Sequence, residues 1–438
     1  MRAIPGSAAM LLWGAAALAQ SIIPNSPGVK GTFAIRDATI HPVTRPVIER
    51  GRIVIAGGTI AAVGPDVAIP PDAEVIDGTG LHVYPGMIDA NTNVGLTEIG
   101  SVRGSVDVAE IGQFNPNARA AVAINPHSEL VPVTRVNGVT TVVVVPEGGV
   151  ISGQDALINL AGWTPDEMIV RAPVAMHVSF PRLRSGGFGG TPNEEEEEKE
   201  AKKGYEKRIE DLKKVVRDAQ AYAKGVRARE QNRGLPPIER DLMLESMIDL
   251  VEGRILVVIH ADQARDIRAA VAFADEMGLR MILAGGAHVQ EVVDLLREKE
   301  IPVLLGPVLA LPPREDDPYD LIFSNAAALH RAGVPFAFQT RDAHNARNLP
   351  YHAAAAAAFG LPKQAALEAV TIAPARILGV ADRLGSLEVG KMANVIVTDG
   401  DPLEIRTSVR HLFIAGEPIP LDSRHTLLYQ KFRARPTP

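Results

Sequence analysis

Between residues 254 and 310, runs of Val, Ile and Leu alternate with amphipathic segments, in the order strand, helix, strand, helix, strand. Strands that are apolar on both faces are typical of a parallel sheet covered by helices. The strand pattern recurs in residues 138–149 and 330–350, and a closing helix follows in residues 365–380. Over about 300 residues, the closed form of this alternation is a (β/α)8 TIM barrel. The pattern therefore predicts an α/β fold with a barrel over residues 85–384.

Both ends of the chain have a different sequence pattern from the middle. Residues 32–84 and 385–421 contain short stretches of alternating apolar residues, interrupted by Gly and Pro turns. A small β-sandwich built from both termini would bury the apolar faces of these strands. We therefore expect residues 20–84 to form its N-terminal part and residues 385–438 its C-terminal part.

A charged segment over residues 185–240 interrupts the alternation. Residues 193–230 have apolar side chains at three- and four-residue steps, which indicates a helix with one thin apolar stripe. The run of Glu falls near its N-terminus, where the helix dipole favours anions. The pattern favours a solvated insertion packed on the barrel rim, and the alternative is a lid or a subunit contact.

The first 19 residues are typical of a secretory signal peptide. Arg2 supplies a positive start, residues 8–18 are apolar, and Ala17, Leu18 and Ala19 precede Gln20 as a small-x-small cleavage site. The apolar run is shorter than the roughly 20 residues of a membrane span. We therefore expect an exported protein, periplasmic or extracellular after cleavage, with no membrane span in its mature form.

Charge and cysteine content exclude some functions. The formal net charge is −7, and nucleic-acid binding usually requires a clustered basic face. The chain has no cysteine, so it uses neither disulfides nor thiolate chemistry. We expect no nucleic-acid partner.

Several long stretches resemble the amidohydrolase superfamily, especially its exported imidazolonepropionase-like and prolidase-like branch. They are residues 57–90, 137–149, 151–163, 365–404 and 412–419. The resemblance implies a barrel with a β-sandwich from both termini, in agreement with the pattern above. It also implies a divalent metal at the C-terminal mouth of the barrel, which would activate water and polarise a carbonyl.

The metal-ligand positions implied by this resemblance are mostly altered. The first strand should end in His-x-His, and this chain has Asn91 and Asn93. Amide oxygens are hard, neutral ligands that suit Ca²⁺ rather than Zn²⁺. The fourth strand should carry a carboxylated Lys, and His177 stands there. The fifth-strand His is kept as His260. Each retained or substituted group is alternatively a hydrogen-bonded part of a packed barrel mouth.

The last two positions are altered as well. Gly285 stands where the sixth strand should supply a His, and His288 lies three residues further on. Arg341 stands where the eighth strand should present an Asp, and Asp342 follows it. If Arg341 points inward, its repulsion with a divalent cation at about 5 Å is roughly 6–7 kcal/mol at an effective dielectric near 20.

Three hypotheses follow. The first is a non-catalytic or impaired subunit, assembled as a homo- or hetero-oligomer with a related, active amidohydrolase. The second is an active hydrolase of amide, peptide or cyclic amide bonds that uses a single divalent metal, Zn in the first instance. The third is a periplasmic protein that binds a small molecule. The candidate residues are Asp342 for catalysis, Asn91, Asn93 and Arg341 for binding, and His260, His177 and His288 for a metal.

Overall fold

Strands from both ends of the chain share one sheet. The computed structural model describes residues 30–183 and 194–436. β5 pairs antiparallel with β16, so that Tyr84 lies opposite Ile396. Ile35 and Ile53 from one end share a buried core with Val395 and Phe413 from the other. The eight strands are β1 (Phe33–Ile40), β2 (Ile48–Ala56), β3 (Thr59–Gly64), β4 (Glu74–Asp77), β5 (His82–Pro85), β16 (Val395–Thr398), β17 (Val409–Ile414) and β18 (Glu417–Pro418).

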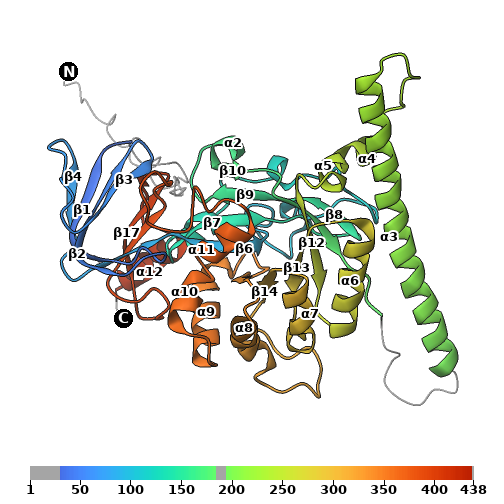
Figure 1. The fold of residues 1–438 in the computed structure, drawn as a ribbon. Helices are drawn as coiled ribbons and strands as arrows, with labels where there is room; N and C mark the ends of the chain where they lie inside the picture. The colour runs from blue at the N-terminus through green and yellow to red at the C-terminus, as the bar shows by residue number, and fades with distance from the viewer. Residues whose placement is uncertain (1–29, 184–193, 437–438) are drawn as a thin grey trace, which may run out of the picture.

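Figure 1 shows this sheet at one end of the molecule and the long helix α3 at the other. Strands from the two ends of the chain therefore pair in one sheet, as the apolar alternation in both end segments predicts. The two-layered sandwich stays a prediction, because the eight strands belong to one hydrogen-bonded sheet. The proposed signal peptide, residues 1–19, lies outside the described residues.

The middle of the chain has a mixed α/β fold with two further sheets. β6 runs parallel to β7, and β11 to β15 run parallel to one another in chain order. The first sheet contains β6 (Met87–Thr92), β7 (Val139–Val144), β9 (Ala156–Asn159) and β10 (Ile169–Arg171). The second contains β8 (Ile151–Gln154), β11 (Ala175–Ser179), β12 (Leu256–Ala261), β13 (Met281–Gly285), β14 (Val303–Leu305) and β15 (Phe336–Phe338).

One extended segment connects these two sheets. Asp155 separates β8 from β9, and these strands pair antiparallel with β11 and β7 respectively. On the other side, the backbone N–H of Arg341 donates to the carbonyl of Asn91 over 2.9 Å. A small apolar cluster draws one or two side chains from each of six strands: Ala90, Ala175, Val258, Ile282, Ala284, Leu304 and Ala337. The sheets therefore enclose a common interior, and the regular (β/α)8 barrel stays a prediction.

Helices cover the outside of the parallel strands. α6 is amphipathic and buries Ile267, Val271 and Phe273. The other helices are α1 (Leu130–Arg135), α2 (Pro165–Met168), α4 (Leu242–Ser246), α5 (Ile248–Val251), α6 (Ala264–Met277), α7 (Val293–Glu298), α8 (Leu321–Ala332), α9 (Leu349–Ala358), α10 (Lys363–Glu368), α11 (Ile372–Ile377) and α12 (Arg424–Arg433), with short 3-10 turns η1 (Arg103–Ser105), η2 (Ala120–Val122), η3 (Val289–Val292) and η4 (Ala346–Asn348).

The charged segment forms the helix α3 (Glu194–Gln231), where the sequence predicts a helix over residues 193–230. Its stripe buries Leu212, Val216 and Ala219. The helix packs beside α4, α5 and α6 and extends beyond the body of the molecule (Figure 1). No helix within the described residues is both long and apolar enough to cross a membrane.

Candidate functional site

The carboxyl ends of β11 and β12 bring His177 and His260 together. His177 Nδ1 lies 2.9 Å from His260 Nε2. His177 Nε2 in turn lies 3.1 Å from Asp155 Oδ2, and both of these side chains are fully buried. Asp155 Oδ1 also accepts the backbone N–H groups of Val174 and Ala175, each over 2.8 Å. The result is a linear chain from Asp155 through His177 to His260.

Hydrogen-bond counting assigns the tautomers of the two rings. A carboxylate can only accept, so His177 Nε2 carries a proton and donates to Asp155. In neutral His177, Nδ1 is then an acceptor, and His260 Nε2 must donate to it. Burial is the largest cause that places the pKa of His260 well below its usual range, so His260 is neutral. Its Nδ1 is therefore a bare lone pair, and this atom is buried without a hydrogen-bond partner among the described residues.

The two asparagines of the first strand are packed into the mouth. Both are at least nine-tenths buried. The Asn93 amide donates to the carbonyl of Val145 over 3.0 Å, and the carbonyl of Asn91 accepts the Arg341 N–H. The Asn93 side chain therefore fills a packing role, whereas the contact of Asn91 is made by its backbone carbonyl, which any residue could supply.

His288 lies away from the other two histidines' chain of hydrogen bonds. Its Nε2 is 2.9 Å from Asp317 Oδ1, and both side chains are buried. Asp317 also accepts from the backbone N–H and the guanidinium of Arg314. His288 thus fastens the loop between β14 and α8.

Asp342 also has local partners. Its Oδ1 accepts the backbone N–H groups of His344 and Asn345, and its Oδ2 accepts the Asn345 amide. Burial acts to raise the pKa of Asp342, but the hydrogen bonds from Asn345 and His344 outweigh it, and the pKa lies below its ordinary value. The carboxylate therefore closes a turn of its own loop.

Arg341 and Asp342 both follow the end of β15 at Phe338. The rule that neighbouring side chains point to opposite faces holds only within a strand, so it does not fix the direction of Arg341. Its backbone has φ 55°, in the left-handed region that is unusual for a residue with a side chain. Arg341 lines a cavity of about 150 Å³ at the mouth, together with Asp262, Asn325 and Leu311.

Gly285 is constrained by its surroundings. Its φ is 100°, and a Cβ at this position would lie 2.4 Å from Asp262 Oδ1 and 3.1 Å from the Ala261 carbonyl oxygen. A histidine here would require both a disfavoured backbone and displacement of Asp262. The backbone and Asp262 at this position therefore leave no room for a side chain on residue 285.

The residues present do not fit the divalent metal that the resemblance implies. A catalytic zinc site needs three protein ligands that converge on one point. Of the candidates, only His177 and His260 lie together, and the nitrogen atoms that face each other are joined by a hydrogen bond. Across the described ranges, no group of three His, Asp or Glu side chains is arranged to hold a metal ion.

Two buried acids that the sequence does not identify are candidate functional residues. Asp155 anchors the histidine pair, and Asp89 is a fully buried acid beside Thr340, whose hydroxyl donates to Asp89 Oδ2 over 2.5 Å. Burial raises the pKa of Asp89 to about 7, against the opposing effect of its hydrogen bonds from Thr340 and Asn91. Each acid lies beside an apolar run, Asp89 after Met87 and Ile88 and Asp155 before residues 156–158, and this position is the signal that could have found them.

The fold and the site together define an α/β protein whose candidate site lies at the carboxyl ends of its parallel strands. The chain belongs to the amidohydrolase family, whose sequence profile matches residues 136–419.

Comparison with individual proteins supports this family assignment. The structure is similar to an amidohydrolase from Thermotoga maritima MSB8, with 27% identity and a TM-score of 0.78 over 89% of this chain and 99% of that one. A prolidase crystallised with N-methylphosphonate-L-proline has 17% identity and a TM-score of 0.54 over 89% of this chain and 99% of its own. This second likeness shows the fold alone.

Among curated proteins, the chain is 23% identical to the amidohydrolase TasK of Hapsidospora irregularis over 420 residues. The match covers 86% of this chain but 40% of that relative. A shorter match, 46% identical over 46 residues, is to a dihydroorotase of Mycobacterium tuberculosis and covers 10% of this chain and 11% of that one.

Proposed function

We propose that this chain is a non-catalytic or impaired member of the amidohydrolase family that acts in assembly with a related, active amidohydrolase. The observation that carries the proposal is the buried chain Asp155–His177–His260. It uses His177 Nδ1, His177 Nε2 and His260 Nε2 for internal hydrogen bonds, which leaves His260 Nδ1 as the one ring nitrogen of the pair that is free for a metal.

Two further features support the loss of the metal. Gly285 has no room for a ligand side chain, and Asp342 is held by the backbone of its own turn. Arg341 at the mouth adds a fixed positive charge close enough to influence His260. A divalent ion would therefore meet few free donors and an unfavourable field.

Metal analysis of the purified full chain tests this proposal. After incubation with excess Zn²⁺ or Mn²⁺ and removal of the free ion, we expect far less than one tightly bound ion per chain. His260→Ala and the wild type should retain equal amounts. One stoichiometric ion in the wild type that is lost in His260→Ala would overturn the proposal and favour an active hydrolase of C–N bonds with a single metal.

A second candidate function is the binding of a small carboxylic acid at the mouth. Arg341 favours it, because it lines the mouth cavity in a left-handed conformation. Within the described part of the chain its guanidinium makes no ion pair or hydrogen bond, and a guanidinium is suited to bind a carboxylate with two parallel bonds.

Thermal shift with dipeptides and small carboxylic acids tests this second function. Arg341→Ala should abolish any stabilisation by the acid, whereas Arg314→Ala, in the loop fastened by His288, serves as a control for the loss of one mouth-side arginine. Stabilisation that survives Arg341→Ala would exclude this site.

Export is part of the same proposal. If the first 19 residues are removed during secretion, the mature protein begins at Gln20. N-terminal sequencing of the secreted protein identifies the first residue, and a mature chain that starts at Met1 would contradict export by cleavage.

A further inference from the structure

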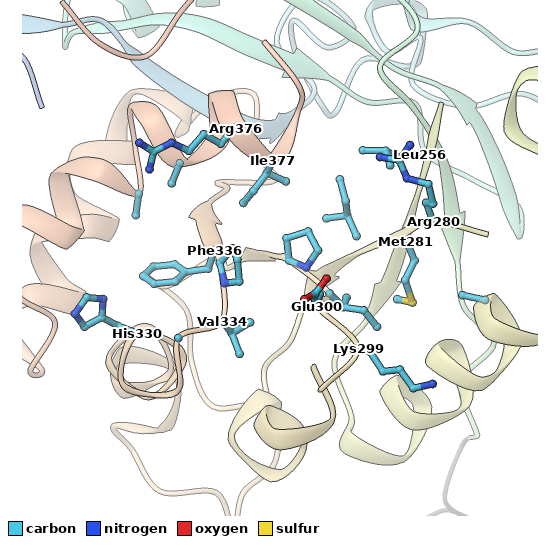
Figure 2. Close-up of a pocket in the computed structure, with 18 of the residues that line it drawn as sticks. Leu256, Arg280, Met281, Lys299, Glu300, His330, Val334, Phe336, Arg376 and Ile377 are labelled. Carbon is cyan, nitrogen blue, oxygen red and sulfur yellow. The ribbon is translucent and has the colours of Figure 1, made fainter. Parts of the chain in front are cut away.

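A large groove lies at the amino ends of the parallel strands, on the side of the molecule opposite His260. Its volume is about 960 Å³, near the upper end of the range for small-molecule sites. Leu256, Met281 and Phe336, the first residues of β12, β13 and β15, all line it. Figure 2 shows these side chains around one central space.

The floor and one wall of the groove are apolar. Leu256 and Ile377 pack against the small interior core, and Ile282 belongs to it. Val334 and Phe336 line another part of the groove, and Figure 2 shows them on the side opposite Met281. A molecule that fills this space must therefore have an apolar body.

Three helices end beside this groove, and one of them ends unusually. A residue in the left-handed conformation follows each helix. It is Gly278 after α6 and Gly333 after α8, with φ 67° and 73°. After α7 the same place is taken by Glu300, with φ 52°. Its N–H bonds to the carbonyl of Arg297, as in a normal helix end. Glycine is strongly favoured here because it has no Cβ, so Glu300 holds a position that its side chain disfavours.

Among the described residues, Arg376 and Glu300 line the groove as unpaired charges, and the unpaired negative charge is the carboxylate of Glu300, which is an exposed residue. No ion pair or hydrogen bond to it occurs among residues 30–183 and 194–436, whereas Lys299 is paired with Asp275 over 2.6 Å. Arg280 donates to the carbonyl of Gly253. Figure 2 shows Glu300 near the centre and the charged ends of Lys299, Arg280 and Arg376 directed away from it.

The helix ends add to this field. The C-terminus of a helix carries partial negative charge on its last carbonyl groups. α6, α7 and α8 each end beside the groove, whose lining includes Asp275 of α6, Glu300 after α7 and Gly333 after α8. A positive group at the centre of the groove would therefore be stabilised both by the carboxylate and by the carbonyls.

We propose that the groove binds a protonated amine on an apolar body. The ammonium group pairs with Glu300, and the hydrocarbon part rests on Leu256, Phe336 and Ile377. This site is independent of the mouth and of any metal there.

Three probes that share a phenylethyl body test the proposal on the full chain: 2-phenylethylamine, the neutral 2-phenylethanol and the anionic 3-phenylpropionate. We expect the amine to raise Tm in a concentration-dependent way, the alcohol to act more weakly and the acid to have no effect. Equal stabilisation by the acid and the amine, or none by the amine, overturns the proposal.

Variants at the end of α7 locate the binding. Glu300→Gln should weaken amine binding by about tenfold or more in calorimetry, which corresponds to the loss of one ion pair. Glu298→Gln removes a neighbouring exposed charge outside the groove and should bind the amine like the wild type. Glu300→Gly should raise Tm without ligand and lose the response to the amine. Unchanged amine affinity in Glu300→Gln rules out Glu300 as the ammonium partner.

Discussion

His177 Nδ1 lies 2.9 Å from His260 Nε2, at the point where the amidohydrolase resemblance implies a metal between these strands. The two rings satisfy each other, and Asp155 behind His177 determines which nitrogen carries each proton. A metal could use His177 Nδ1, His177 Nε2 or His260 Nε2 only after these hydrogen bonds were broken, whereas His260 Nδ1 has no hydrogen-bond partner among the described residues. The mouth of this barrel-like fold is therefore held together by direct hydrogen bonds between its own side chains.

Replacement of Asp155 should destabilise the protein. In Asp155→Ala, the buried N–H groups of Val174 and Ala175 lose their acceptor, and each unsatisfied group costs about 1–3 kcal/mol. We expect a loss of about 3 kcal/mol or more in chemical denaturation. Asp316→Asn, at a carboxylate whose side chain is 80% exposed, is the matched control and should change stability by less than about 0.5 kcal/mol. A small effect of Asp155→Ala would mean that these groups find other partners.

Asp155→Asn should reverse the tautomers instead. If the amide group introduced by this substitution donates to His177 Nε2, His177 Nδ1 must carry the proton and donate to His260 Nε2. The bare lone pair of His260 then moves from Nδ1 to Nε2. Ring ¹⁵N NMR separates protonated from unprotonated nitrogens, so the His260 signals should exchange character between wild type and variant. Identical ring spectra would show that Asp155 does not determine the tautomers.

Gly285→Ala should cost more stability than Gly278→Ala. Both glycines have positive φ, which costs a residue with a Cβ about 1–2 kcal/mol. At Gly278 the added Cβ has nothing within 4 Å, whereas at Gly285 it would meet Asp262 Oδ1 at 2.4 Å. The difference in the free energy of unfolding therefore reflects the contact with Asp262 together with the larger φ of Gly285, 100° against 67°, and we expect about 1 kcal/mol or more. Equal costs would show that Asp262 moves aside freely.

Asp89 should make stability depend on pH. Its pKa is raised from 3.8 to about 7 by burial, so the folded state keeps a proton that the unfolded state releases. This proton linkage stabilises the fold fully below about pH 4, and the contribution falls by on the order of 4 kcal/mol as the pH rises to about 7. Asp89→Asn removes the titration. The stability of the variant relative to wild type should therefore rise between pH 5 and 8, and a constant difference over this range would refute the buried neutral acid.

Leu212→Ala should loosen α3. Leu212 is fully buried in the stripe of this helix, and truncation of a buried Leu costs about 2–5 kcal/mol. Because α3 packs along one edge of the body (Figure 1), we expect limited proteolysis to cleave it earlier while the remaining body stays resistant. Ile111→Ala, at a side chain that is 99% exposed, is the control and should leave the cleavage pattern unchanged. Equal resistance of Leu212→Ala and wild type would mean that α3 is held by its ion pairs.

Much of the fold follows from local patterns in the sequence. β7 is buried on both faces, so its Val residues follow one another without alternation. α6 is buried along one stripe, so its apolar residues recur with the helical period. Together these two patterns indicate a parallel sheet covered by helices. The stripe of α3 is visible in the same way. The sequence pattern of β8 and β9 does not predict which strands they pair with. Their antiparallel partners, β11 and β7, are separate segments of the chain.

The candidate site is less accessible from the sequence. The family resemblance singles out His177, His260 and Gly285 as substituted or retained positions, but it does not say what each atom touches. The partners of His288 and Asp342 come from Asp317 and from the backbone of residues 344 and 345. Loop conformation alone determines these contacts. Arg341 also lies three residues beyond the end of β15 at Phe338, so the strand pattern does not fix the direction of its side chain.

The sequence by itself determined the alternation of elements, the family and the residue types at the ligand positions that the resemblance implies, because these depend on residue identity and short-range spacing. Only the tertiary structure decided that Asp155 supports the histidine pair, that Gly285 has no room for a side chain, and that Glu300 faces an apolar groove. Each of these is a relationship between atoms that are distant along the chain, and hydrogen bonds and contacts act over a few ångströms in space, whatever their separation in sequence.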